Sequence, residues 1–172
     1  MKNEVMKVFN TYTEALSKGD FGEVFKIISD DIVWHMGGES SLSGVIVGKQ
    51  ALGERLSEFT KRSKGTFRIM INWAASNDYF VAASVISLAE RGEEKLKNPG
   101  IDLFRIENGK IQEVWTFGEL QEEEDRFWEW EKKPIVAKKS FAIGFFYNIL
   151  TNSHFYQIDF YIFRIYNVYT KY

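Results

Sequence analysis

The chain has 172 residues, of which 45% are hydrophobic and 16% aromatic, enough for one domain with a sizeable core plus an appendage. A formal net charge of −2 and the scatter of basic residues among acids exclude the cationic stripe that nucleic acid requires. The absence of cysteine excludes disulfides, thiolate nucleophiles and cysteine-ligated metals, and together with a polar N-terminal stretch it favours a cytoplasmic location.

Three amphipathic helices are expected in the first third of the chain. Across residues 4–17, apolar side chains recur at spacings of three and four, and Gly19 follows as the expected end of this helix. Asp20 is suited to cap a second helix. A third helix is predicted over residues 49–63, with its charged side chains on one side.

A first strand is expected between the second and third helices, over residues 32–36. Its alternation places Trp34 and Met36 on one face and His35 on the other. From Gly65 the period changes to two, which predicts further strands that include the segments FRIMINW, IDLFRIE and KIQEVWTF. Asn108-Gly109 between the last two segments is a strong hairpin signal.

This order of elements predicts an α+β fold over residues 1–131. We expect a cone-shaped barrel of curved, mixed or antiparallel sheet, with three N-terminal helices packed on its concave face and a short acidic helix closing the unit. Such a cone leaves a hollow between the helices and the sheet. The opposite, convex face is predicted to form a homodimer interface that includes Arg68, Met70, Asn72, Val81, Ala83 and Val85.

Residues 132–172 are predicted to be a separate, aromatic-rich C-terminal extension. From residue 134 onward the net charge is +3, against −5 before it, and twelve of the last 39 residues are Phe or Tyr. Its longest apolar run is far shorter than the roughly 20 residues that span a bilayer. Three interpretations stay open: the extension packs on a dimer surface, lies on a membrane, or is a disordered, non-native addition.

The residues predicted to line the hollow are mostly aromatic. They are Trp34, Met36, Phe67, Trp73, Phe104, Glu113, Trp115 and Phe117. Side chains of this kind are also the ones that fill cores, so each has a structural alternative. An aromatic wall would suit a planar, apolar ligand.

Asp102 is the most informative of the polar candidates. A two-residue turn at 108–109 pairs it with Trp115, and alternation places it on the same face as Phe104 whether or not a bulge slips the pairing. A carboxyl group on an apolar face should have a raised pKa and could donate a hydrogen bond. The alternatives are an aspartate at the rim of the cone or one paired with an arginine.

The motifs DDIVWHMGG, LSGVIVGKQAL, KGTFR, IDLFRIENGKIQEVW and DRFW resemble SnoaL-like domains of the nuclear-transport-factor-2-like superfamily. They occur in the family's order across about residues 5–130, and together they are more specific for the fold than for a function. This fold carries isomerases, cyclases, dehydratases and binding domains without activity.

The resemblance to the ketosteroid-isomerase branch implies roles for three positions. Tyr12 and Asp102 match the tyrosine and aspartic acid of that family's oxyanion hole. Met36 stands where the family has its general-base aspartate, and a thioether cannot accept a proton from carbon. Tyr12 also lies on the apolar stripe of its helix, so a core tyrosine bonded to the backbone is an equal alternative.

His35 is a candidate replacement base because histidine titrates near neutral pH. Alternation nevertheless turns it away from Trp34 and Met36, which favours a structural role. Glu113, predicted on the inner face, is a second possible acid. We therefore treat Asp102, Tyr12 and His35 as the catalytic candidates.

The sequence thus predicts a small-molecule pocket protein without a metal or a nucleotide cofactor. If it is an enzyme, the expected chemistry is isomerase, cyclase or dehydratase chemistry on an apolar carbonyl substrate. The alternative is a non-catalytic ligand-binding or dimerisation module. The expected partners are a small apolar ligand and a second copy of the chain, with no nucleic acid and with membrane contact only through the extension.

Overall fold

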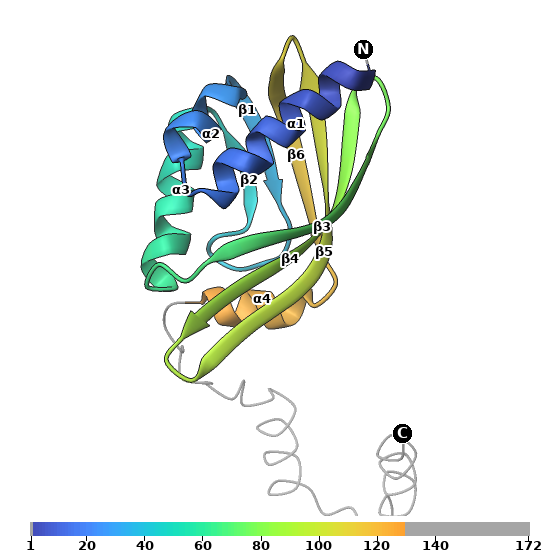
Figure 1. Cartoon of the computed structure of the whole chain (residues 1–172). Coiled ribbons are helices and arrows are strands. Elements are labelled where there is room, and N and C mark those ends of the chain that lie inside the picture. Colours follow the sequence, from blue (N-terminus) through green and yellow to red (C-terminus); the bar gives the residue numbers. More distant parts are fainter. Residues whose placement is uncertain (1, 130–172) are drawn as a thin grey trace, which may run out of the picture. The chain divides into compact units, whose positions relative to one another are not determined.

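The computed structural model describes residues 2–129, and the predicted extension over 132–172 lies outside the described residues. Four helices and six strands make up this part (Figure 1). In chain order they are α1 (Lys2–Ser17), α2 (Phe21–Ile27), β1 (Ile28–Met36), β2 (Gly44–Val47), α3 (Lys49–Arg62), β3 (Arg68–Ser76), β4 (Phe80–Arg91), β5 (Glu94–Glu107), β6 (Lys110–Gly118) and α4 (Gln121–Trp128).

The helices begin and end where local sequence signals predict. Gly19, after α1, has a φ of +68°, a left-handed conformation that glycine adopts without a steric cost. The Asp20 side chain accepts a hydrogen bond of 3.1 Å from the backbone N–H of Glu23 and thereby caps α2. On α1, Val5 and Phe9 are buried against the sheet, as the spacing of apolar residues predicts.

The six strands form one mixed sheet in the order β2-β1-β6-β5-β4-β3. Only the β1–β6 pair is parallel, and the others are antiparallel. The strongly curved sheet wraps around α1, α2 and α3, and α4 lies beside the long β4–β5 ribbon (Figure 1). The predicted α+β architecture is confirmed, with the sheet open rather than closed into a barrel.

The hairpin between β5 and β6 contains a bulge that changes the predicted register. Asn108 and Gly109 both have positive φ, at +52° and +72°, and make the expected two-residue turn. The pairing then slips by one residue because Gln112 has no partner across the hairpin. Asp102 consequently pairs with Thr116, and the predicted pairing with Trp115 is wrong.

A second bulge, at Asn72, interrupts β3. Ile71 pairs with Val85, whereas Trp73 pairs with Ser84, so Asn72 is the unpaired residue. The bulge reverses the alternation of the strand and turns Trp73 out of the predicted hollow, with 55% of its surface exposed. The prediction that Trp73 faces inward is therefore wrong.

The predicted convex face needs a related correction. Val81, Ala83 and Val85 are buried in the main core, because Val81 pairs with Phe104 and shares its face. The outer side of β4 is formed by the alternate residues of that strand. Within residues 2–129, no helix is long and apolar enough to cross a membrane.

Candidate functional site

A cavity of about 170 Å³ lies between the helices and the inner side of the sheet. Every helix and every strand except β2 contributes at least one lining residue, and most of these residues are apolar. Five of the predicted pocket residues are among them: Trp34, Met36, Phe67, Phe104 and Phe117. Phe117 is nevertheless 58% exposed, and its side chain points to the outer side of the sheet because the preceding residue, Thr116, faces the helices.

Tyr12 projects from α1 into this cavity and is buried. Its ring packs against Phe104, with 5.6 Å between the ring centroids, and against Phe9 at 6.4 Å. No residue within 2–129 forms a hydrogen bond with its hydroxyl group. Burial, and then the nearby Asp102 charge, raise the pKa of Tyr12 above its ordinary value, so the hydroxyl keeps its proton.

Asp102 lies on β5, half-buried in the wall of the same cavity. It receives no hydrogen bond from the part of the chain that the structure describes. Burial, with a further contribution from the charge of Glu124, raises the pKa of Asp102 from 3.8 to about 7. A carboxyl group in this environment is largely protonated just below neutral pH and can then donate a hydrogen bond.

The indole N–H of Trp34 is a third polar group without a hydrogen-bond partner among residues 2–129. The residue is 8% exposed and lines the cavity, but its Nε1–H is fully enclosed by protein atoms. An unsatisfied buried donor costs about 1–3 kcal/mol. A ligand in the cavity would therefore contact the ring of Trp34 and not its N–H.

Glu124 on α4 is a second carboxyl group in the lining, and sequence analysis did not single it out. Its two oxygens accept hydrogen bonds from Asn98 Nδ2, at 2.5 Å, and from Trp128 Nε1, at 3.3 Å. The four-residue spacing between Glu124 and Trp128 is visible in the sequence, but it does not show that Glu124 lies in the cavity.

His35, Glu113 and Trp115 lie together on the other side of the sheet, outside the cavity lining. His35 Nε2 is 2.8 Å from Glu113 Oε1, and its ring stacks on Trp115 with 5.2 Å between centroids. Arg105 Nε donates to Glu113 Oε2 at 3.2 Å. Hydrogen bonds from His35 and Arg105 hold the pKa of Glu113 below its ordinary value.

This cluster corrects the inward placement predicted for Glu113 and Trp115. The bulge at Gln112 reverses the alternation of β6, so that Val114 and Thr116 face the helices instead. His35 points away from Trp34 and Met36, as its strand alternation indicates. With its side chain held by Glu113 outside the cavity, His35 cannot reach a ligand bound there.

No cluster of three or more His, Asp or Glu side chains suited to a metal ion occurs among residues 2–129. The polar groups in the lining are instead a phenol, three carboxyls, a guanidinium, hydroxyls and amides. Such a set can bind a small molecule through one or two oxygens and exchange protons with it.

A helix-covered curved sheet around an apolar cavity defines a class of small pocket proteins. The family model of the SnoaL-like domain matches residues 9–114, and the chain belongs to this family. No curated protein matches the sequence.

Solved structures agree with the family assignment. A Xanthomonas campestris protein of unknown function with a cystatin-like fold is 34% identical, with 72% of this chain and 97% of that chain covered and a TM-score of 0.69. Bal32a, from a soil-derived mobile gene cassette, is 20% identical over 74% and 98%, with a TM-score of 0.70. A putative polyketide cyclase from Xanthomonas campestris is 18% identical over 70% and 94%, with a TM-score of 0.55.

Proposed function

We propose that the cavity binds a small apolar carbonyl compound and promotes isomerase, cyclase or dehydratase chemistry on it. The observation that carries this proposal is the pair formed by Tyr12 and Asp102. Both are polar groups in an apolar cavity, and neither has a hydrogen-bond partner within residues 2–129. Both groups line an apolar cavity with their hydrogen-bonding capacity unused by residues 2–129, so a ligand oxygen can accept from both.

The proposed chemistry is the stabilisation of a developing oxyanion. Burial raises both pKa values, so Tyr12 keeps its proton at neutral pH and Asp102 is mostly neutral below about pH 7. When a proton leaves the carbon next to a carbonyl, negative charge moves to the carbonyl oxygen. Donors already aimed at that oxygen in a site with little water stabilise the charge without having to reorganise.

The putative polyketide cyclase shares this fold, and carbonyl chemistry in a protein of the same fold is compatible with the proposed substrate class. The second candidate function, a binding or dimerisation module without catalysis, is favoured by Met36. This residue lines the cavity at the position where the related isomerases carry their base, and it cannot take up a proton.

The proposal includes a homodimer formed through the outer side of the sheet. Met70, Trp73 and Phe117 lie on this side with about half of each side chain exposed. Exposed apolar patches of this kind mark association surfaces. Light scattering of the full-length chain should give the mass of a dimer, and Trp73→Asp should give a monomer. A monomeric wild type would contradict this part of the proposal, as would a Trp73→Asp dimer of undiminished stability.

The proposal also places the protein in the cytoplasm, where a chain without cysteine needs no oxidative folding. Fractionation of cells that produce the untagged chain would test this location. Recovery in the cytoplasmic fraction is expected, and recovery with the membrane or in the medium would contradict it.

Native mass spectrometry with small-molecule extraction tests the central part of the proposal. The full-length chain, purified from its own host, should carry a stoichiometric apolar compound with a carbonyl or enol oxygen. Asp102→Asn should lose most of this compound, whereas Glu113→Gln on the other face should keep it. A ligand without such an oxygen, or equal retention by Asp102→Asn, would contradict the proposal.

A further inference from the structure

The cavity contains a carboxylate whose surroundings differ from those of Asp102. Each oxygen of Glu124 accepts one N–H hydrogen bond, from Asn98 and from Trp128. The Asn98 side-chain oxygen accepts a hydrogen bond of 2.8 Å from the backbone N–H of Leu120. Because that bond occupies the amide oxygen, the amide NH₂ is directed at Glu124. Burial raises the pKa of Glu124 above its ordinary value, and the two N–H donors oppose this rise by favouring the ionised form.

The backbone around Glu124 leaves room for this arrangement. A Cβ at Gly118 would collide with the Asn98 amide and would lie 3.0 Å from Glu124 Oε2. Gly100 lies between Asn98 and Asp102 on the cavity side of β5 and adds no side chain there. A Cβ at Gly100 would collide with the backbone carbonyl of Phe117, so both glycines are required by the close approach of protein atoms around Asn98 and Glu124.

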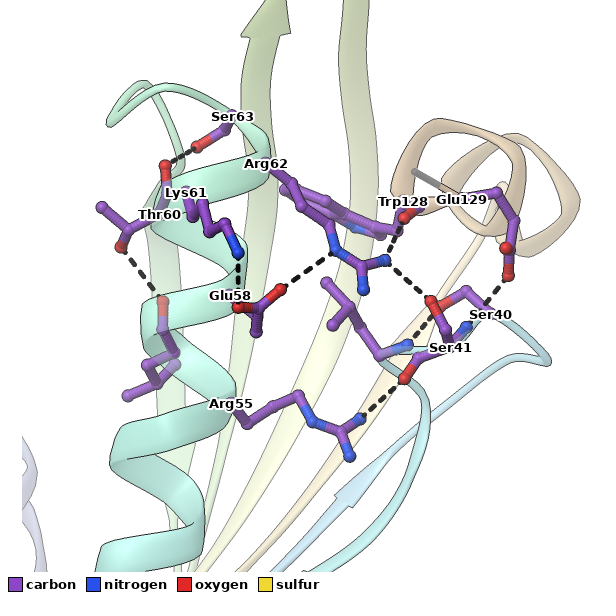
Figure 2. Close-up of polar contacts among 12 residues, drawn as sticks. Ser40, Ser41, Arg55, Glu58, Thr60, Lys61, Arg62, Ser63, Trp128 and Glu129 are labelled. Atoms are coloured by element: carbon purple, nitrogen blue, oxygen red, sulfur yellow. Dashed lines mark hydrogen bonds and ion pairs between the residues drawn. The ribbon is translucent and has the colours of Figure 1, made fainter. Parts of the chain in front are cut away.

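The helix that carries Glu124 is fixed to the rest of the domain. Asp125 accepts backbone hydrogen bonds from Glu39 and Ser40, at 2.9 Å and 3.2 Å. Figure 2 shows Arg62 of α3 reaching the carbonyl oxygen of Trp128, at 2.5 Å, and Ser41 Oγ, at 2.7 Å. A side chain on a helix that is anchored at Asp125 and Trp128 holds its geometry better than one on a free loop.

We propose that Glu124 is the general base of this cavity, in the role that Met36 cannot fill. This assignment rests on the proposed function. Glu124 and Asp102 form an unequal pair: the first has two N–H donors and takes up a proton, and the second has none and donates one. Pairs of carboxyl groups in such contrasting surroundings are how one site supplies both an acid and a base.

The proton-transfer step balances within the site and the substrate. The Glu124 carboxylate takes a proton from the carbon next to the carbonyl group. The electron pair of the C–H bond forms a C=C bond, and the π pair of the C=O bond moves to the oxygen. Tyr12 and neutral Asp102 hydrogen-bond the resulting enolate. The proton on Glu124 then returns to another carbon, or to a leaving hydroxyl group, so that no oxidant or reductant is required.

The ring opening of 5-nitrobenzisoxazole tests the base without knowledge of the natural substrate. A base removes the proton on carbon, the N–O bond breaks, and a coloured cyanonitrophenolate forms. The full-length chain should open this probe faster than acetate at the same carboxylate concentration. Glu124→Gln should lower kcat/KM at least about tenfold, since general-base catalysis contributes about 10²–10⁴-fold. Glu123→Gln, which removes an exposed charge from the same helix, should leave it within about twofold.

A pH profile separates a base from a structural residue. The wild-type rate should rise with pH and then level off, with an inflection that Glu124→Gln removes and Glu124→Asp partly retains. No acceleration by the wild type, or an unchanged rate and inflection in Glu124→Gln, would overturn the assignment. So would an inflection that is lost in Asp102→Asn but kept in Glu124→Gln.

Binding of 1-naphthol, followed by fluorescence, distinguishes failure of the Glu124 assignment from failure of the proposed function. Its hydroxyl group mimics an enol and should need Tyr12 and Asp102 rather than Glu124. If naphthol binds and Glu124→Gln opens the probe at the wild-type rate, only the base assignment is wrong. If naphthol does not bind to the wild type, the proposed oxyanion site itself is wrong.

Discussion

Asp102 on β5 and Glu113 on β6 belong to neighbouring strands, yet they lie on opposite faces of the sheet and have opposite pKa shifts. Asp102 lies in the cavity without a hydrogen-bond partner among residues 2–129, and its pKa rises to about 7. Glu113 lies on the outer face between His35 and Arg105, and its pKa falls. The comparison shows that the pKa of a carboxyl group on this sheet depends on whether the side chain faces the cavity or the outer side.

The largest expected effect tests that face assignment with two consecutive residues of β6. Val114 is completely buried, whereas Trp115 stacks on His35 at the outer face. Val114→Asp should destabilise the full-length chain by about 3 kcal/mol or more, because it buries an unpaired charge. Trp115→Asp should lower the free energy of unfolding by clearly less, because this side chain lies at the outer face. Urea unfolding of both variants measures the difference, and equal losses would contradict the bulge at Gln112.

The next effect concerns turnover. With the compound recovered by native mass spectrometry as substrate, Asp102→Asn should reduce kcat at least about tenfold, since complete loss of one oxyanion donor costs about 10²–10³-fold. Glu113→Gln removes a carboxyl group from the other face and should leave kcat within about twofold. Circular dichroism should show both variants folded. Equal effects of the two substitutions would remove the distinction between the faces.

The pH dependence of stability should have opposite signs for the two carboxyls. Asp102 ionises near 3.8 in the unfolded chain and near 7 when folded, so the folded state holds the extra proton between these values. Stability contributed by Asp102 is therefore complete below about pH 4 and falls as pH rises to 7, by at most about 1.4 kcal/mol per pH unit. The free energy of unfolding of Asp102→Asn, relative to that of the wild type, should therefore rise from pH 4 to pH 7.

Glu113 provides the matched control for that measurement. Its folded pKa is lowered, so the stability it contributes is present above its unfolded pKa and is lost as pH falls. In urea unfolding, Glu113→Gln should therefore be less stable than the wild type near neutral pH, and this difference in the free energy of unfolding should shrink as the pH falls. Parallel pH curves for Asp102→Asn and the wild type would show that Asp102 is not perturbed.

The smallest effect is expected at Trp34. Its indole N–H is buried without a partner, so Trp34→Phe removes an unsatisfied donor and should change stability by no more than about 1 kcal/mol. Affinity for 1-naphthol should change by less than about twofold, because the enclosed N–H does not reach a ligand. Titration calorimetry with thermal unfolding measures both quantities. A severalfold loss of affinity would show that the indole N–H contacts the ligand.

Sequence periodicity predicted the part of the site that lies on regular strands. Asp102 and Phe104 share a face, and Trp34 and Met36 share the cavity side of β1, because side chains alternate strictly along an undisturbed strand. Periodicity failed beyond Asn72 and Gln112, because each bulge inserts one residue and reverses every later side chain of its strand. Neither position carries a glycine that would have signalled a bulge.

Glu124 was beyond sequence reasoning for a different reason. The segment QEEEDRFW offers four consecutive acidic side chains, and only the docking of α4 decides which one enters the cavity. That docking depends on hydrogen bonds between distant segments, such as the one from Arg62 to the carbonyl oxygen of Trp128. Contacts over this sequence separation leave no local pattern.

Infrared difference spectroscopy of the full-length chain at about pH 6 tests the central comparison most directly. The spectrum of the wild type minus that of Asp102→Asn should contain the C=O stretch of a protonated carboxyl group, and the corresponding Glu113→Gln difference should contain only carboxylate bands. This result would establish a neutral donor in the cavity and an ionised partner of His35 outside it. Carboxylate bands alone in the Asp102→Asn difference would contradict the account.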